Sequence, residues 1–426
     1  MIDDNKDTPP ESPDSHLDMY ENDIVELDED DVEEVVLEEI EGVESDEESL
    51  DEDENHENYS HGPTIRLRKG PVPDTSDFHF KKHEGSVFCC NLDPKNGNIA
   101  VTGGEDEKAF VWEIDTGMIL LECTGHKDSV IAAEFSHDGS HLVTADISGG
   151  IQVWRTSTNS LIWSENVGDI TWVKWHHGTH VLMAALHNGN VYMWKIPSGE
   201  MKVLPGHDMA SDCGIYMPDG RRAIIGYVDG CMKLFDLKTG SVLTKFEAGE
   251  IHDAAISGLA AHSDNNLILT GGGDGKVNLI KTQPSKVLAK FKCNKDSGDS
   301  DWVETVGFCK DATMSLASAG TIGGNLYIWD IAQQALRHKI FLHCGISRML
   351  WDAHHPIIYT GCLGGVININ DAKSGKILKE LIGHSDNILD ISLSSVGDQN
   401  RILLSAGDDN ASRVFSIDVT ELYKNL

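Results

Sequence analysis

The sequence predicts an all-β protein in which eight similar units of about 43 residues close into one ring behind an acidic tail. Short alternating strands run from residue 78 onward, without a long helical stretch. A histidine opens most of the units, at His83, His126, His207, His252 and His384. The gaps between these histidines correspond to one, two, one and three units, and one more unit follows His384.

Residues 1–62 differ from the rest of the chain in charge. Of the formal net charge of −36, most lies here, because the first 60 residues hold 27 Asp and Glu against one base, Lys6. Few aromatics and dense charge predict a disordered tail. Residues 23–43 place Val32, Val35, Val36 and Ile40 near helical spacing, which fits either a helix formed on a partner or a solvated tail. We expect a linker at 63–77, with a sparse basic patch at 66–69.

This composition excludes several classes of function. An acidic chain repels nucleic acid and anionic membranes, and it favours basic partners. No apolar run reaches the length of a membrane span, and the acidic N-terminus is unlike a secretory signal. The nine cysteines are an odd number without a C-x-x-C pair, which predicts reduced structural thiols in a cytoplasmic or nuclear protein. We expect a monomer that uses no cofactor and no metal.

A period of 40–45 residues with four strands is typical of a β-propeller blade. A closed ring allows neighbouring blades to cover each other's faces and removes long free edges. After Ser416 too little chain remains for an outermost strand in the last unit. The alternating residues 78–82 precede the first unit and have no blade of their own. We therefore expect an eight-bladed propeller over 78–426, in which strand 78–82 completes the last blade.

The stretch AVTGGEDEKAFVW, from Ala100 to Trp112, could be a glycine-rich ligand loop, an acidic metal loop or a hairpin turn. It lacks the third glycine and the helix of a dinucleotide loop, and it lacks the ligand spacing of a helical calcium loop. A turn between two strands is the better interpretation. The equivalent position of the other units is predicted at Ser148, Asn188, Asp229, Asp274, Gly323, Gly364 and Asp409. Catalytic motifs such as H-E-x-x-H and G-x-S-x-G are missing, which favours a binding platform.

The recurring G-H, turn Asp and W-D elements, as in GHKDSV and IWD, resemble WD-repeat proteins across roughly residues 78–423. In that family a turn Asp, the histidine, a strand Ser or Thr and a Trp indole form a buried hydrogen-bonded set. The resemblance implies such a set in blade one at His83, Thr102, Asp106 and Trp112. The further structural residues it implies are His126, Trp154, His207, Asp229, Asp274, Trp329, His384 and Asp409. Blades six and seven, with glycine at the turn, should lack the set.

A closer resemblance lies in SVFCCNLDPKNGNIAVTGGEDEKAFVW, GHKDSVIAAEFSHDG and GHSDNILDISLS, which are similar to the angio-associated migratory cell protein family. Its fungal relative is a dedicated escort chaperone for a newly made ribosomal protein of the large subunit. The resemblance implies cytoplasmic capture of that basic protein until it reaches the ribosomal precursor. In animals the family is also associated with cell migration, vessel formation and heparin binding, so a signalling scaffold with several partners is the alternative.

Two positions in each unit are expected to face the top rim of the ring. The first directly precedes the turn. The second is the start of the innermost strand, taken as the residue that begins it and the residue two positions further on. The acids expected there to bind a basic partner are Glu105, Asp169, Asp212, Glu304 and Asp408. Trp302 and Phe88 are the expected apolar contacts, and Glu84, Asp128, Asp301 and Asp386 are further acids of the same region.

Overall fold

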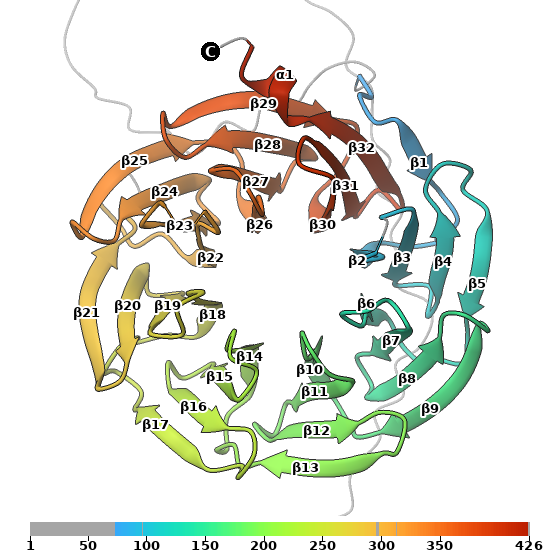
Figure 1. Ribbon diagram of the computed structural model, residues 1–426, viewed down its shortest axis with the longest axis horizontal. Coiled ribbons are helices and arrows are strands. Elements are labelled where there is room, and N and C mark those ends of the chain that lie inside the picture. The colour runs from blue at the N-terminus through green and yellow to red at the C-terminus, as the bar shows by residue number, and fades with distance from the viewer. Residues whose placement is uncertain (1–72, 96, 295–297, 312, 425–426) are drawn as a thin grey trace, which may run out of the picture. The chain divides into compact units, whose positions relative to one another are not determined.

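The computed structural model describes residues 73–424, apart from 96, 295–297 and 312. The predicted acidic tail at 1–62, the basic patch at 66–69 and most of the predicted linker lie outside the described residues. The described chain forms eight four-stranded antiparallel sheets arranged around a central axis, as Figure 1 shows. This is the eight-bladed β-propeller that the sequence predicts. None of the described residues forms a helix that could span a lipid bilayer.

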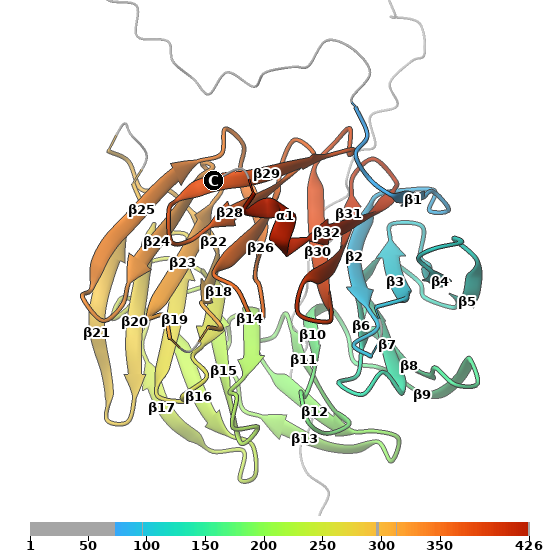
Figure 2. The same cartoon turned by 45° about the horizontal axis from the view of Figure 1, so that its top comes forward.

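Each blade runs from an innermost strand at the axis to an outermost strand (Figures 1 and 2). The strands of blades one to four are, in chain order, β2 (Val87–Leu92), β3 (Ile99–Gly104), β4 (Ala109–Glu113) and β5 (Ile119–Cys123); β6 (Val130–Phe135), β7 (His141–Asp146), β8 (Gly150–Arg155) and β9 (Ser160–Asn166); β10 (Ile170–Trp175), β11 (Val181–Leu186), β12 (Val191–Lys195) and β13 (Glu200–Leu204); β14 (Ser211–Tyr216), β15 (Arg222–Tyr227), β16 (Met232–Asp236) and β17 (Val242–Phe246).

The remaining blades repeat this order. Blades five to seven are β18 (Ile256–Ala261), β19 (Leu267–Gly272), β20 (Lys276–Thr282) and β21 (Ser285–Lys292); β22 (Val303–Phe308), β23 (Leu316–Thr321), β24 (Asn325–Asp330) and β25 (Ala335–Phe341); β26 (Ile346–Trp351), β27 (Ile357–Cys362), β28 (Val366–Asp371) and β29 (Lys376–Ile382). Blade eight contains β30 (Ile388–Val396), β31 (Asn400–Gly407), β32 (Ser412–Asp418) and β1 (Phe78–Phe80).

Blade eight contains strands from both ends of the described chain. β1 pairs antiparallel with β32, with Phe78 opposite Val414 and Phe80 opposite Ser412. Ahead of β1, the amide of Thr75 donates to Ile382 O of blade seven at 2.7 Å. Phe80 also stacks on Trp112 of blade one, with ring centroids 4.4 Å apart and planes 3° apart. One short segment therefore joins blades seven, eight and one.

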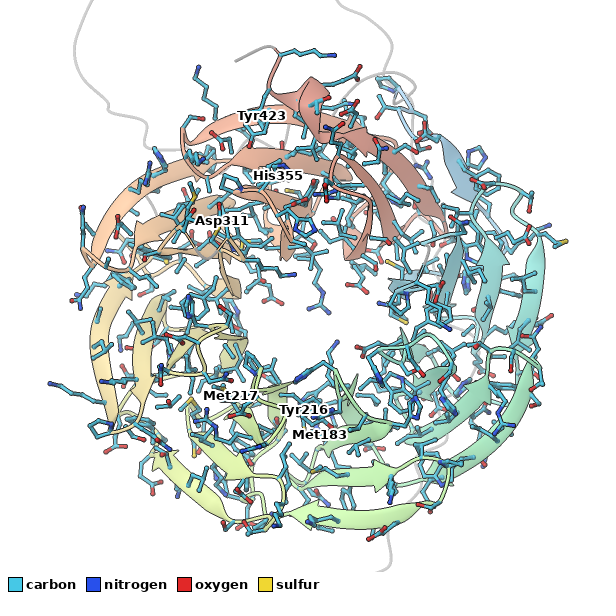
Figure 3. All side chains as sticks on the ribbon, viewed as in Figure 1. Met183, Tyr216, Met217, Asp311, His355 and Tyr423 are labelled. Atoms are coloured by element: carbon cyan, nitrogen blue, oxygen red, sulfur yellow. The ribbon has the colours of Figure 1, made fainter. Side chains whose placement is uncertain are left out.

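The apolar core is divided among the spaces between neighbouring blades. Between blades three and four, for example, Trp172, Met183 and Tyr227 are buried and Tyr216 packs against them (Figure 3). Between blades seven and eight, the short helix α1 (Val419–Leu422) adds Val419 and Leu422 to the core. Because each blade shares its core with two neighbours, no blade can bury its faces without the ring.

Four blades contain a histidine held between a carboxylate and a hydroxyl. In blade one, Nδ1 of His83 donates to Asp106 Oδ1 at 2.9 Å, and its Nε2 lies 2.9 Å from Thr102 Oγ1. The same two contacts recur at 2.7 to 2.9 Å in blades two, five and eight; these sets are His126 with Asp146 and Thr144, His252 with Asp274 and Thr270, and His384 with Asp409 and Ser405. They tie the loop that enters each blade to its second strand and its turn.

The tryptophans differ from the implied set. Trp154 Nε1 donates to Thr144 Oγ1 at 3.2 Å, so blade two has all four members. In blade one the buried Nε1 of Trp112 has no hydrogen-bond partner among the described residues. Phe80 from β1 stacks on this indole, so Trp112 acts in ring closure and not in the histidine set. Trp329 stacks on Phe291, with centroids 4.9 Å apart.

The turn positions predicted from spacing lie in the turns of blades two and six, but in both blades the carboxylate that orders the turn comes from another position. His126 is held by Asp146, at the end of β7, while Ser148 Oγ only donates to this carboxylate at 2.7 Å. In blade six the fully buried Asp301 accepts hydrogen bonds from Thr321 Oγ1 at 2.6 Å and from Gly323 N at 2.9 Å. A Cβ at position 323 would lie 2.3 Å from Asp301 Oδ1, which explains the glycine there. Asp301 is thus structural and is not a rim acid.

A buried ion pair joins blades seven and eight. Arg401 Nε donates to Asp352 Oδ2 at 2.6 Å and Nη2 donates to Oδ1 at 3.0 Å, and both side chains are 0% exposed. The amides of His354 and His355 also donate to Asp352; Figure 3 shows His355 at this junction. Burial alone would raise the pKa of Asp352, but the hydrogen bonds and charge of Arg401 lower it to about 2.

We expect Asp146→Ala to lower the free energy of unfolding by about 2–3 kcal/mol, because it leaves His126 and the blade-two turn without their buried acceptor. Ser148→Ala is the matched control and should cost less than about 1 kcal/mol, because Ser148 is only a donor to that carboxylate. Urea unfolding followed by circular dichroism measures both. Equal losses would show that the position predicted from spacing is as important as Asp146.

The Asp352–Arg401 pair should make stability fall in acid. Because the folded-state pKa of Asp352 is depressed, its contribution is present above about pH 4 and is lost as the pH falls toward 2. Arg401→Met leaves an uncompensated buried carboxylate and should cost about 3–5 kcal/mol at neutral pH. Thermal melts of both proteins between pH 2 and pH 7 test this. The difference in stability should shrink as the pH falls through this window, and a constant difference would contradict the assignment.

Candidate protein-binding site

The rim predicted from the sequence is a set of eight repeated backbone contacts. In every blade, the residue before the turn position donates its amide to the carbonyl of the residue that leads into the innermost strand. The pairs, at 2.7 to 3.1 Å, are Glu105 with Ser86, Ile147 with Ser129, His187 with Asp169, Val228 with Ala210, Gly273 with Ala255, Ile322 with Trp302, Leu363 with Gly345, and Asp408 with Asn387. We call these sixteen residues the rim.

A second ring of residues lies just inside the rim. All eight innermost strands carry a β-bulge at their second residue, which has no partner in the neighbouring strand. The bulge residues are Phe88, Ile131, Thr171, Asp212, Ser257, Glu304, Ser347 and Leu389. A bulge bends its strand and redirects one side chain while the flanking pairs remain in register. The side chain at this position therefore differs from blade to blade while the pairing of the strands stays the same.

The five predicted acids fall into these two rings. Glu105 is exposed and accepts a hydrogen bond from Ser86 N at 3.1 Å, and Asp169 is exposed. Asp408 is half-buried and accepts one from Asn387 Nδ2 at 3.0 Å. Asp212 and Glu304 are bulge residues of blades four and six. The acids thus occupy blades one, three, four, six and eight, around the axis and not on one side of it.

Asp212 is an exposed residue and Glu304 is half-buried, and the carboxylates of both are partly shielded from solvent by their surroundings. Burial raises the pKa of Asp212. Burial also raises the pKa of Glu304; the charge of Arg348 partly offsets this shift, and the charge of Asp212 adds to it. Such a pair gains stability when a further cation approaches. A lysine or arginine side chain of a partner would supply that cation.

The charged residues deeper along the inner strands were missed by the sequence reasoning. Arg348 is exposed, and its Nε lies 3.3 Å from Asp390 Oδ1. Lys174 lies 3.7 Å from Glu134 Oε2. Arg348 in β26 and Asp390 in β30 each follow the bulge directly. A prediction that assumes strict alternation along the strand therefore assigns them to the wrong face. The bulges follow from pairing between strands, so no pattern along the sequence would have located these residues.

The rim also carries exposed apolar side chains beside the acids. Trp302 is 46% exposed, and its ring covers Gly273 of blade five, where a Cβ would lie 3.2 Å from the ring. Ile322, whose amide donates to Trp302 O, is exposed as well, and so is Ile147 of blade two. Phe88 is half-buried at its bulge. Exposed aromatic anchors flanked by charges are typical of protein-binding surfaces.

The histidine of blade four departs from the structural role implied for it. His207 Nε2 lies 3.6 Å from Asp229 Oδ1, beyond hydrogen-bond distance, and has no partner among the described residues. Ile225 occupies the position that Thr102 has in blade one, so the hydroxyl is missing. Asp229 instead accepts a hydrogen bond from Cys231 N at 3.0 Å.

Comparison with known proteins agrees with this architecture. The WD domain, G-beta repeat family matches residues 75–113, 117–155, 242–281 and 375–416. The angio-associated migratory cell protein of Homo sapiens is 40% identical over 355 residues, which cover 81% of each chain. The ribosome assembly protein SQT1 of Saccharomyces cerevisiae is 23% identical over 376 residues, 80% of this chain and 86% of that protein.

Solved structures show the same fold. The crystal structure of Saccharomyces cerevisiae Sqt1 superposes with a TM-score of 0.74 at 23% identity, covering 81% of this chain and 99% of that one. Chaetomium thermophilum Sqt1, bound to the N-terminus of the ribosomal protein L10, superposes with a TM-score of 0.71 at 18% identity, covering 80% and 100%. With 40% identity over four fifths of its length to a curated member, the chain belongs to the angio-associated migratory cell protein family of WD-repeat proteins.

Proposed function

We propose that the chain is a non-enzymatic escort chaperone that captures a basic segment of a newly made large-subunit ribosomal protein in the cytoplasm. The observation that carries this proposal is the arrangement of five acids and an exposed tryptophan around the axis of the propeller, three of the acids on the rim and two at the bulges inside it. WD-repeat propellers are typically protein-interaction platforms, and the Sqt1 relative bound to the N-terminus of L10 supports this partner class.

The free energies of the individual contacts show how much of the binding charge and burial can each supply. An exposed ion pair contributes only about 0–1 kcal/mol, whereas nanomolar binding needs about 12 kcal/mol. Five acids therefore cannot hold the partner by charge alone. Burial of the indole of Trp302 against a partner side chain supplies a larger part, and the acids set selectivity and the rate of association.

Reversing the charge of two rim acids and one bulge acid tests the site. The triple variant Glu105→Lys, Asp169→Lys and Glu304→Lys should weaken binding of a peptide from the L10 N-terminus by about 100-fold at low salt, through lost attraction and new repulsion. The matched control reverses three exposed acids of the outermost strands: Glu165→Lys, Glu200→Lys and Glu380→Lys. Calorimetric titration of both proteins measures the effect. Unchanged affinity in the rim variant would exclude this site.

Removing the aromatic anchor tests the contribution of burial. Trp302→Ala should weaken binding of the same peptide by about 2 kcal/mol or more, mainly through faster dissociation. Leu336→Ala is the control, because Leu336 is 53% exposed on the outermost strand of blade six and pairs with Trp329, at the end of the blade opposite the rim turn. Surface plasmon resonance separates the two rates. An equal effect of both variants would argue against an anchor at Trp302.

Purification of the tagged chain from growing cells tests the function itself. Recovery of one ribosomal protein together with its messenger RNA is the outcome expected for capture during synthesis. Recovery of many unrelated signalling or cell-surface partners would instead favour a scaffold in cell migration, and would overturn the chaperone proposal.

A further inference from the structure

Blade four lacks the hydroxyl that completes the histidine set elsewhere. In blades one, two, five and eight, Nε2 of the histidine meets a Thr or Ser hydroxyl at 2.7 to 2.9 Å. In blade four that position is Ile225, and the buried Nε2 of His207 has no hydrogen-bond partner among the described residues. A buried polar atom without a partner costs about 1–3 kcal/mol, so this atom needs an explanation.

Two further donor groups surround this orphaned nitrogen. The ligand atoms of His207, Asp229 and Cys231 all lie within 4.8 Å of one another. Gly230, with a φ of 87°, makes the tight turn that places the carboxylate and the thiol side by side. Cys231 is 1% exposed, whereas His207 and Asp229 keep about a quarter of their side-chain surface in solvent. The cluster is therefore closed at the thiol and open at its outer edge.

We propose that His207, Asp229 and Cys231 bind a zinc ion in blade four, with a water molecule at the fourth position. Imidazole nitrogen, carboxylate oxygen and thiolate sulfur are the usual ligands of zinc, and three protein ligands with one open position make a tetrahedral site. Tetrahedral zinc places its ligand atoms about 3.3 to 3.8 Å apart, so side-chain movements of about 1 Å complete the site. In blade four Nε2, and not Nδ1 as in the other sets, lies on the side of the turn carboxylate, so an ion held by Asp229 and Cys231 also becomes the partner of Nε2.

Zinc binding displaces one proton from the cluster. Burial lowers the pKa of His207. Burial, together with the charge of Asp229, raises the pKa of Cys231 to about 11. The side chain is therefore a thiol until a metal displaces its proton. One proton leaves the sulfur as the zinc–sulfur bond forms.

The neighbouring Lys233 does not occupy the site. Its Nζ donates to Pro205 O at 3.3 Å and to Gly206 O at 2.6 Å, and burial lowers its pKa. The ring of Tyr227 packs edge-on against His207, with centroids 4.2 Å apart, and holds the imidazole in place. Lys233 lies 5.5 Å from the centroid of the same ring.

A second cluster of possible ligands, His137, Asp138 and His180, does not carry the same inference. Asp138 Oδ1 accepts hydrogen bonds from Ser136 Oγ at 2.8 Å and Ser140 Oγ at 2.7 Å, and it lies 3.1 Å from His180 Nε2. These groups satisfy one another. The cluster also contains no sulfur, so a probe that reports on thiolate coordination distinguishes the two places.

Cobalt titration of the metal-free full chain tests the proposal, because Co²⁺ coordinated by a thiolate absorbs in the near ultraviolet. We expect a sulfur-to-cobalt band that saturates at one equivalent and that zinc bleaches. Cys231→Ala should abolish the band, and Cys123→Ala, which removes another buried thiol, should retain it. No such band in the wild-type chain, or a band that survives in the Cys231→Ala variant, would overturn the proposal.

A substitution that spares the buried cysteine guards against misfolding. His207→Gln keeps the thiol and the carboxylate, and it should lower the affinity for Co²⁺ by about 100-fold or more. Added zinc should raise the melting temperature of the wild-type chain by mass action and should leave that of Cys231→Ala unchanged. Equal stabilisation of both proteins would place the ion elsewhere and contradict the assignment.

Discussion

The structure depends on closure of the ring. Each four-stranded blade presents two faces that only its neighbours can cover. If the ring were open between two blades, each of those blades would expose one face to solvent. Closure is made by three residues of β1, which complete blade eight from the other end of the described chain. Phe80 extends this contact to Trp112, and Thr75 extends it to blade seven. A hydrogen-bonded and stacked junction therefore holds together sequence positions more than 300 residues apart.

Repetition gives every blade the same backbone and leaves two positions free to differ. The amide–carbonyl contact of the rim and the bulge of the innermost strand recur in all eight blades, whatever side chain stands there. The side chains at these places differ widely in charge and size, although Ile131 packs against the core between blades two and three and Ser347 Oγ donates to Ile388 O of blade eight. Binding chemistry is thus added at positions that share one backbone arrangement in all eight blades.

The histidine sets show how one structural problem receives several solutions. The loop entering a blade must be tied to the second strand, and four blades do this with a histidine between a carboxylate and a hydroxyl. Blade six reverses the direction, because Asp301 comes from the entering loop and accepts from Thr321 and Gly323. In blade four the replacement of a hydroxyl by Ile225 leaves His207 beside Asp229 and Cys231. The exceptions are therefore the places where new chemistry can arise.

The sequence by itself determined the repeat number, the four-stranded unit and the strand that completes the last blade, because periodic patterns and histidine spacing depend on local order along the chain. It also identified which residues stand on the rim, because equivalent positions in a repeat share one backbone environment. Only the tertiary structure decided the partners of those residues. Asp146, and not a residue of the turn, holds His126, and Asp301 is buried, because a hydrogen bond depends on where a carboxylate points and not on its count from a tryptophan. The bulges that aim Asp212 and Glu304, and the meeting of His207 with Cys231, likewise follow from pairing between strands, which no spacing along one strand contains.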